Sequence, residues 1–218
     1  MTTNEFIEYN KIIAICRRMD VSDILKLAEA LQKGGVLMME VTFDQSNVNC
    51  CRDTARAIEA LNREFGDSMR IGAGTVLTEE QVFAAKAAGA KYIISPNVNT
   101  SVIQTTKREG MTSIPGASTP SEIEVAYESG ADFVKLFPAG FFGTGYFKDV
   151  RAPLSHIKLI ATAGINETNL ASFMEAGAIG AGISSYLTSK ELVKEGRFDE
   201  LTRRAAIMSA IAAQYRET

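Results

Sequence analysis

Apolar runs alternate with amphipathic segments along the whole chain, and one kind of junction joins them repeatedly. A helix-like segment ends in a small or polar residue, a glycine follows, and an apolar run begins within a few residues. Glycine after the end of a helix adopts the left-handed conformation that closes it, and a run of aliphatic residues suits a strand buried on both faces. This pattern predicts helix-to-strand junctions in the segments that begin at Lys33, Ala87, Arg108, Glu128 and Glu175.

The apolar runs predict eight strands separated by helices. Segment 21–33 shows the helical period, since Ile24, Leu27 and Leu31 fall on one face. The predicted strands are Ile12–Cys16, Leu37–Phe43, Arg70–Gly74, Tyr92–Ser95, Thr112–Pro115, Phe133–Phe137, Lys158–Ala161 and Ala178–Ile183. Eight strands alternating with helices are typical of a TIM (β/α)8 barrel. No G-x-G-x-x-G follows the first strand to favour a doubly wound dinucleotide-binding sheet.

Both ends of the chain also have helical patterns. Segment 3–10 precedes the first strand, segment 198–215 follows the last, and no Ser/Gly-rich linker divides the sequence. We therefore expect a single α/β domain over residues 1–218, a TIM barrel with an extra N-terminal helix. A chain of 218 residues lies near the lower end of the range for this fold, so its connections should be short.

Composition and charge restrict the partners. A net charge of −3 provides no basic surface for nucleic acid or for an anionic membrane. No run approaches the roughly 18 apolar residues of a membrane span, and the first residues lack the pattern of a signal peptide. The cysteines form no CxxC pair and His156 is the only histidine, so the chain lacks the usual ligand set of a zinc site. We expect a cytoplasmic protein with reduced thiols and a small-molecule partner.

One lysine interrupts an apolar strand, in the run "DFVKLFP" that begins at Asp132. Side chains alternate across a barrel strand, and the active sites of such barrels lie at the C-terminal ends of the strands. If Val134 and Leu136 pack against the helices, Lys135 points into the barrel. The same alternation on the second strand directs Glu40 inward. These two residues form either a structural ion pair or a catalytic pair.

The catalytic interpretation depends on the protonation of the lysine. An amine with the ordinary pKa of about 10.4 is almost entirely cationic at neutral pH. Burial in an apolar strand lowers the pKa, and the neutral amine can then attack a substrate carbonyl to form a Schiff base. A nearby carboxylate opposes this shift, so Glu40 should carry protons, through water, rather than pair tightly with Lys135.

Small and polar residues follow several predicted strands at the same end. Arg17 follows the first strand, "GAGT" leads to Thr75 after the third, and Pro96 follows the fourth. Taken singly, glycine and proline after a strand mark a turn, but after successive strands they leave room for a substrate against the backbone. Backbone N–H groups after the seventh and eighth strands, near Gly164 and Ser184, could hold an anion.

At these positions the sequence resembles the 2-keto-3-deoxy-6-phosphogluconate (KDPG) and 4-hydroxy-2-oxoglutarate (KHG) aldolase family, over essentially the whole chain. The matching motifs are "MEVTF" around Glu40, "IGAGTV" from Ile71, "YIISPN" from Tyr92, "SIPGAST" from Ser113, "FVKLFPA" from Phe133 and "TAGI" from Thr162. They occur in the same order as in the family, each at a strand end. They identify the family as a group without separating its members.

The resemblance implies a homotrimer of TIM barrels that cleaves or forms 2-keto-4-hydroxy acids by class I aldolase chemistry, with no metal or other cofactor. Lys135 matches the Schiff-base lysine and Glu40 the general acid/base. The positions implied to bind substrate are Arg17, Thr75, Pro96, Thr162, Gly164, Ser184 and Ser185. The implied substrates are KDPG or KHG, with the 6-phosphogalactonate epimer or an unphosphorylated keto sugar acid as alternatives.

Two places depart from the family pattern. Asp44 stands where the family typically carries an arginine for the substrate carboxylate. A carboxylate there repels an anionic substrate unless it points away, so we expect Arg17 to take a larger share of charge recognition. The anion-binding rim has Ala163-Gly164 in place of paired glycines and Ser184-Ser185 in place of Gly-Ser. These changes leave open whether the substrate is phosphorylated.

Two hypotheses of other kinds are compatible with the same residues. In a phosphate-binding isomerase or synthase, Lys135 would be only a cationic contact. In a non-catalytic protein that binds sugar acids or phosphate, Lys135 and Glu40 would form a structural ion pair.

Overall fold

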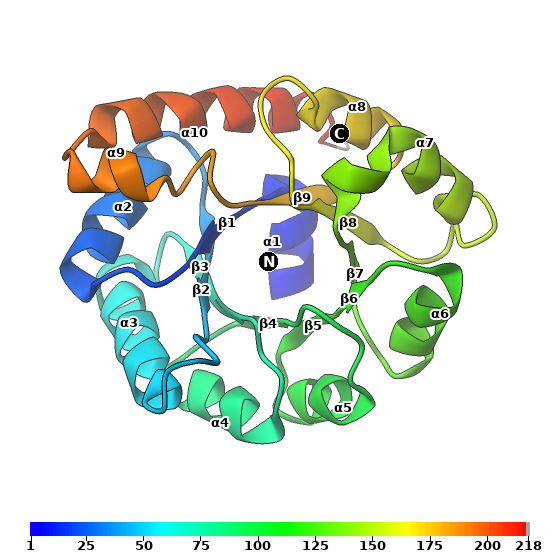
Figure 1. The fold of residues 1–218 in the computed structure, drawn as a ribbon, viewed down its shortest axis with the longest axis horizontal. Helices are drawn as coiled ribbons and strands as arrows, with labels where there is room; N and C mark the ends of the chain where they lie inside the picture. The colour runs from blue at the N-terminus through cyan, green and yellow to red at the C-terminus, as the bar shows by residue number, and fades with distance from the viewer. Residues whose placement is uncertain (217–218) are drawn as a thin grey trace.

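Parallel strands form a ring that helices surround (Figure 1). The computed structural model describes residues 1–216. Its strands are β1 (Ile12–Cys16), β2 (Met38–Thr42), β3 (Arg70–Gly74), β4 (Tyr92–Ile94), β5 (Thr112–Ile114), β6 (Gly116–Ala117), β7 (Val134–Leu136), β8 (Leu159–Thr162) and β9 (Gly180–Ile183). They pair in the order β5-β4-β3-β2-β1-β9-β8-β7-β6. Because β5 leads directly into β6, the sheet closes on itself, which confirms the predicted TIM barrel.

Pro115 divides one predicted strand, 112–115, into β5 and β6. Proline has no backbone N–H to donate to a neighbouring strand, but its carbonyl still accepts a hydrogen bond of 2.8 Å from the backbone N–H of Lys135. β5 pairs with β4 and β6 pairs with β7. The eight predicted strands therefore correspond to nine segments, and the predicted and observed bounds differ by at most two residues, apart from the extension through β6.

Apart from the N-terminal helix, the helices cover the outside of the ring, as Figure 1 shows. Those described are α1 (Thr3–Asn10), α2 (Val21–Lys33), α3 (Cys50–Phe65), α4 (Glu79–Ala87), α5 (Thr100–Arg108), α6 (Pro120–Glu128), α7 (Ala139–Arg151), α8 (Leu170–Glu175), α9 (Lys190–Lys194) and α10 (Phe198–Ala213). α10 lies against α2 and α8. Within residues 1–216, every helix is too short or too polar to span a bilayer.

Buried side chains form two clusters, one on each side of the sheet. The outer cluster fills the space between strands and helices and includes Val41 of β2 and Val134 and Leu136 of β7. The inner cluster is made of Ile7, Ile13, Met38, Tyr92, Ile94, Ile114, Phe133 and Ile160. The alternation used to orient the strands is therefore confirmed, and the interior of the barrel is largely apolar.

The predicted N-terminal helix, α1, closes the end of the barrel at which the strands begin. It lies in the centre of the ring in Figure 1, and its Ile7 belongs to the inner cluster. Asn4 fixes its position: its side-chain amide donates to Asp132 at 2.9 Å and accepts from the Thr112 hydroxyl at 2.6 Å. This end of the barrel is sealed, so ligands reach the interior from the C-terminal ends of the strands.

Candidate active site

Lys135 lies at the middle of β7 with its side chain inside the barrel. It is 8% exposed, and its neighbours Val134 and Leu136 face the helices. Its Nζ lies 5.1 Å from the centre of the Phe137 ring, close enough for a cation–π contact while the amine is charged. The lysine that interrupts an apolar strand is thus held in the interior and not on the surface.

Glu40 approaches the same interior from β2 and is 2% exposed. Its carboxyl lies over Gly74 of β3, where an added Cβ would stand 2.5 Å from Oε1. The sequence indicated that glycine here admits substrate to the backbone. The structure shows instead that Gly74 leaves room for the Glu40 carboxyl.

Burial is the main electrostatic influence on both groups. It raises the pKa of Glu40 to about 7, against the opposing effects of the cations Lys135 and Arg17. Burial also lowers the pKa of Lys135; Arg17 adds to this decrease and Glu40 opposes it. Among the described residues, Glu40 Oε2 has no hydrogen-bond partner and no ion pair joins it to Lys135. The neutral forms are therefore favoured more than for the same groups in water.

A cavity of about 700 Å³ opens above this pair, at the C-terminal ends of β1, β2, β3 and β9. Four of the predicted substrate-binding residues line it together: Arg17, Thr75, Ser184 and Ser185. Thr42, two residues beyond Glu40 on the same face of β2, also lines it. Glu40 and Lys135 are buried and are not among the residues that line this cavity.

The other three predicted substrate-binding residues lie outside the set that lines the cavity. Thr162 is buried at the end of β8, and its Oγ1 has no partner among the described residues. The carbonyl of Pro96 lies against Gly116, where a Cβ would be 2.5 Å from that oxygen. Gly164 has a left-handed φ of 74° and packs on the backbone of Gly140 in α7. Its conformation thus serves the turn between β8 and α8.

Asp44 faces the cavity, but its charge is compensated locally. Its Oδ1 accepts hydrogen bonds from the Ser46 hydroxyl at 2.7 Å, the Ser46 backbone N–H at 3.2 Å and the Arg18 guanidinium at 3.0 Å. These Ser46 bonds, with Arg18, hold the pKa of Asp44 below its usual value. The predicted repulsion of an anionic substrate is therefore reduced by Arg18, a residue that the sequence analysis did not consider as a partner for Asp44.

Two further cavity residues were missed by the sequence analysis. Gln45 donates from Nε2 to the carbonyl of Thr75 at 2.7 Å and so ties the loop after β2 to the loop after β3. Lys190, at the start of α9, also lines the cavity. A lysine in the first turn of a short helix carries no local signal of a binding role, so only the folded arrangement brings this cation to the site.

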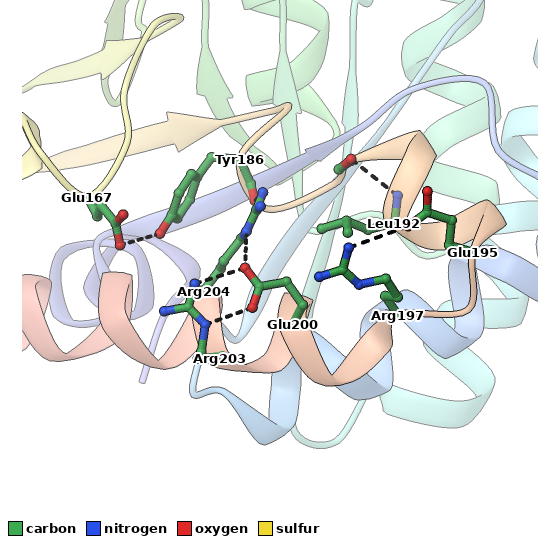
Figure 2. Close-up of polar contacts among 9 residues, drawn as sticks. Glu167, Tyr186, Leu192, Glu195, Arg197, Glu200, Arg203 and Arg204 are labelled. Atoms are coloured by element: carbon green, nitrogen blue, oxygen red, sulfur yellow. Dashed lines mark hydrogen bonds and ion pairs between the residues drawn. The ribbon is translucent and has the colours of Figure 1, made fainter.

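A network on the outer side holds the loop that carries Ser184 and Ser185 (Figure 2). The Tyr186 hydroxyl donates to Glu167, after β8, at 2.6 Å. Arg204 of α10 donates to the carbonyl of Tyr186 at 3.2 Å, and Glu200 accepts from Arg204 at 2.8 Å. The loop after β9 is thus anchored to both the loop after β8 and the C-terminal helix.

The remaining candidate groups lie apart from this site. His156 is exposed and makes an edge contact with Tyr127, with 5.0 Å between ring centres. Cys16, Cys50 and Cys51 are free thiols, as predicted. The described residues contain no group of three or more His, Cys, Asp or Glu side chains placed to hold a metal ion.

Comparison with known proteins places the whole barrel in one family. The model of the KDPG and KHG aldolase family matches residues 3–204. The chain is 34% identical to the 2-dehydro-3-deoxy-phosphogluconate aldolase of Treponema pallidum (strain Nichols), over 93% of each chain. It is also 34% identical to the 2-dehydro-3-deoxy-6-phosphogalactonate aldolase of Escherichia coli (strain K12), over 94% of this chain and 95% of that one.

Two solved structures show the same fold. A native KDPGal structure superposes with a TM-score of 0.83 at 32% identity, covering 94% of this chain and 95% of that one. The KDPG aldolase of Legionella pneumophila, solved with pyruvate as a covalent carbinolamine intermediate, superposes with a TM-score of 0.79 at 25% identity, covering 100% and 99%. The family model and these relatives show that this chain belongs to the KDPG and KHG aldolase family.

Proposed function

We propose that the protein cleaves and forms 2-keto-4-hydroxy acids as a class I aldolase, with Lys135 as the Schiff-base residue and Glu40 as the general acid/base. The observation that carries the proposal is the buried pair itself. An amine and a carboxyl from different strands share a largely apolar interior without an ion pair, and burial shifts the pKa of each toward neutrality. A structural pair would instead gain most from a direct, fully hydrogen-bonded contact.

The reaction follows from these two groups. The neutral amine of Lys135 adds to the C2 carbonyl of the substrate, and loss of water from the carbinolamine gives a protonated imine. Glu40 removes the proton of the C4 hydroxyl, the C3–C4 bond breaks, and its electrons enter the imine to form an enamine as the aldehyde leaves. Protonation at C3 and hydrolysis release pyruvate and the free lysine. The pyruvate carbinolamine captured in the Legionella relative corresponds to the last covalent intermediate of this sequence, formed when water adds to the imine of pyruvate.

Substrate recognition is assigned to the cavity above the pair. Arg17 and Lys190 bring positive charge to it, and Ser184 and Ser185 bring polar groups. This set suits an anionic, hydroxylated acid. The 34% identical relatives are named for the gluconate and for the galactonate form of the phosphorylated acid, so KDPG and its epimer are the two leading candidates.

A homotrimer and a cytoplasmic location are also expected. Apolar side chains on the surface support association: Phe141 at the start of α7 is 84% exposed and packs on Phe142, which packs on Tyr146. A chain 32% identical to this one is part of a cage designed by fusing symmetric oligomeric domains. The location stays a prediction from the sequence.

Covalent trapping tests the assignment of Lys135. Treatment with pyruvate and borohydride should reduce the imine and leave a stable adduct on Lys135, located by peptide mass spectrometry. Lys135→Arg, which keeps the charge but has no nucleophilic amine at neutral pH, should give no adduct and no turnover. A wild-type protein that turns over substrate without forming this adduct would exclude the proposed mechanism.

Gly74→Ala tests the placement of Glu40. The added methyl group must displace the carboxyl that lies over Gly74, and a misplaced acid/base group lowers the rate of cleavage by about 10²-fold. Trapping of pyruvate should persist, because Lys135 is untouched. Ala73→Gly is the matched control: it changes one methyl group on the helix-facing side of β3. Similar loss of activity in both variants would mean that the effect comes from the strand and not from Glu40.

A substrate panel tests the recognition site. Pyruvate release should be measured from KDPG, from its galactonate epimer and from KHG, with wild-type protein and with Lys190→Gln. We expect the phosphorylated acids to be preferred and the variant to raise their KM several-fold, because an anion contact is lost. If the variant has the same KM for every substrate, Lys190 has no part in recognition.

The mass of the particle tests the trimer. Light scattering after gel filtration should give three times the chain mass of 23.6 kDa. Phe141→Asp should lower this mass if the exposed aromatic cluster lies in the interface, since an interface core excludes isolated charges. A wild-type mass equal to that of one chain would reject the trimer.

A further inference from the structure

The interior of the barrel contains a buried tyrosine hydroxyl that no hydrogen bond satisfies among the described residues. Tyr92 is fully buried, and its hydroxyl has no hydrogen-bond partner among the described residues. A buried polar group without a partner destabilises the folded state, whereas phenylalanine would fill the same space without this penalty. The hydroxyl therefore requires a hydrogen-bond partner. Glu40 Oε2 is another buried oxygen that has none among the described residues.

The strand register brings these two oxygens toward each other. Glu40 of β2 is level with Gly72 of β3, and the pairing of Ala73 with Ile93 makes Gly72 level with Tyr92 of β4. All three positions face the interior. Gly72 has no side chain, so nothing from β3 stands between the glutamate and the tyrosine.

The tyrosine ring occupies the space that Gly72 leaves. A Cβ on Gly72 would lie 2.2 Å from Cε2 and 2.5 Å from Cζ, the carbon that bears the hydroxyl. The ring therefore lies across β3. Burial raises the pKa of Tyr92 and the charge of Glu40 adds to this rise, so the hydroxyl lies within electrostatic reach of the carboxyl on β2. The carboxyl of Glu40 lies one step further along the barrel, over Gly74.

We infer that Tyr92 is a positioning residue for Glu40, its hydroxyl donating to one enclosed water molecule that donates in turn to Glu40 Oε2. The inference rests on the proposed role of Glu40. No direct hydrogen bond joins the two side chains, and one water between two buried polar groups satisfies both, since such a water forms two to four hydrogen bonds. The bridge fixes Oε2 and leaves Oε1 toward the substrate.

The bridge also acts on the protonation of Glu40. A hydrogen bond donated to a carboxylate favours its ionised form and so lowers its pKa. The charged groups that act on Glu40 are Lys135 from β7 and Arg17 after β1, both of which lower its pKa. The Cys16 thiol of β1 lies on the helix-facing side of the sheet. Burial raises the pKa of Cys16 to about 12 and that of Tyr92 well above its usual value, so both stay neutral near pH 7.

Tyr92→Phe tests the inference, because it removes the hydroxyl and keeps the ring on Gly72. The titration of Glu40 is followed by infrared spectroscopy of its carboxyl C=O stretch, with Glu40→Gln to assign the band. The pKa of Glu40 should rise by about one unit. Cleavage then falls about tenfold at pH values below that pKa, since fewer molecules hold the ionised base, and pyruvate trapping on Lys135 is retained.

Tyr215→Phe is the matched control. It removes a hydroxyl that donates to Glu175 at 3.3 Å on the outside of the barrel, and it should leave the Glu40 titration unchanged. Replacing Tyr92 with a fluorotyrosine, whose phenol is a stronger donor, should shift the Glu40 pKa in the opposite direction from Tyr92→Phe. This second variant keeps the polar contact, so it serves even if Tyr92→Phe folds poorly.

An unchanged Glu40 titration in folded Tyr92→Phe, or in the fluorotyrosine protein, would overturn the inference. A purely structural hydroxyl would alter only the unfolding temperature. A different result would contradict the proposed function, namely turnover by Glu40→Gln at the wild-type rate. The infrared titration would still show whether Tyr92 acts on the pKa of Glu40.

Discussion

The placement of one amine away from water governs the rest of the structure. An ordinary lysine is too fully protonated to act as a nucleophile near neutral pH, and desolvation is the dominant influence that lowers the pKa of Lys135. The apolar interior provides that environment. Phe133, just before β7, lies on the same face as Lys135, and Ile7 of α1 closes the far end of the barrel. A closed barrel with one sealed end thus provides what the proposed chemistry of Lys135 requires.

Glycines on β3 are the second structural requirement. Gly72 and Gly74 both face the interior, and each leaves its space to a side chain from a neighbouring strand: the Tyr92 ring and the Glu40 carboxyl. A strand with two inward side chains would exclude both groups. The motif "GAGT" therefore has a steric role beyond forming a turn, and it couples the position of the Glu40 carboxyl to the packing of an aromatic ring.

Much of the fold could be predicted from the sequence because each strand carries a local signal. Burial on both faces gave continuous apolar runs, and the period of two on β2 and β7 placed Glu40 and Lys135 inside. The split at Pro115 was the main difference in the strands. Local patterns specify well which face of the sheet each side chain points to, since a shift of one residue would move every side chain of the strand to the opposite face.

The arrangement of the rim could not be predicted in the same way. Arg18 pairs with Asp44 across two strand ends, and this contact depends on the conformation of both loops, including a left-handed φ of 50° at Arg18. Lys190 reaches the cavity from α9, far along the chain. Periodicity carries no information about such contacts between loops, so the sequence placed the inward-facing residues Glu40 and Lys135 better than the residues that line the cavity.

Among the described residues, Lys135 and Glu40 form no ion pair, and this affects which protonation states they can adopt. In a tight pair the lysine would stay cationic and the glutamate anionic, and each step that needs a free amine or a protonated acid would have to break that contact. Here burial favours the neutral forms, while Arg17 lowers the pKa of both groups. The charged and neutral arrangements are thus brought closer in free energy, and protons can be exchanged with a bound substrate near neutral pH.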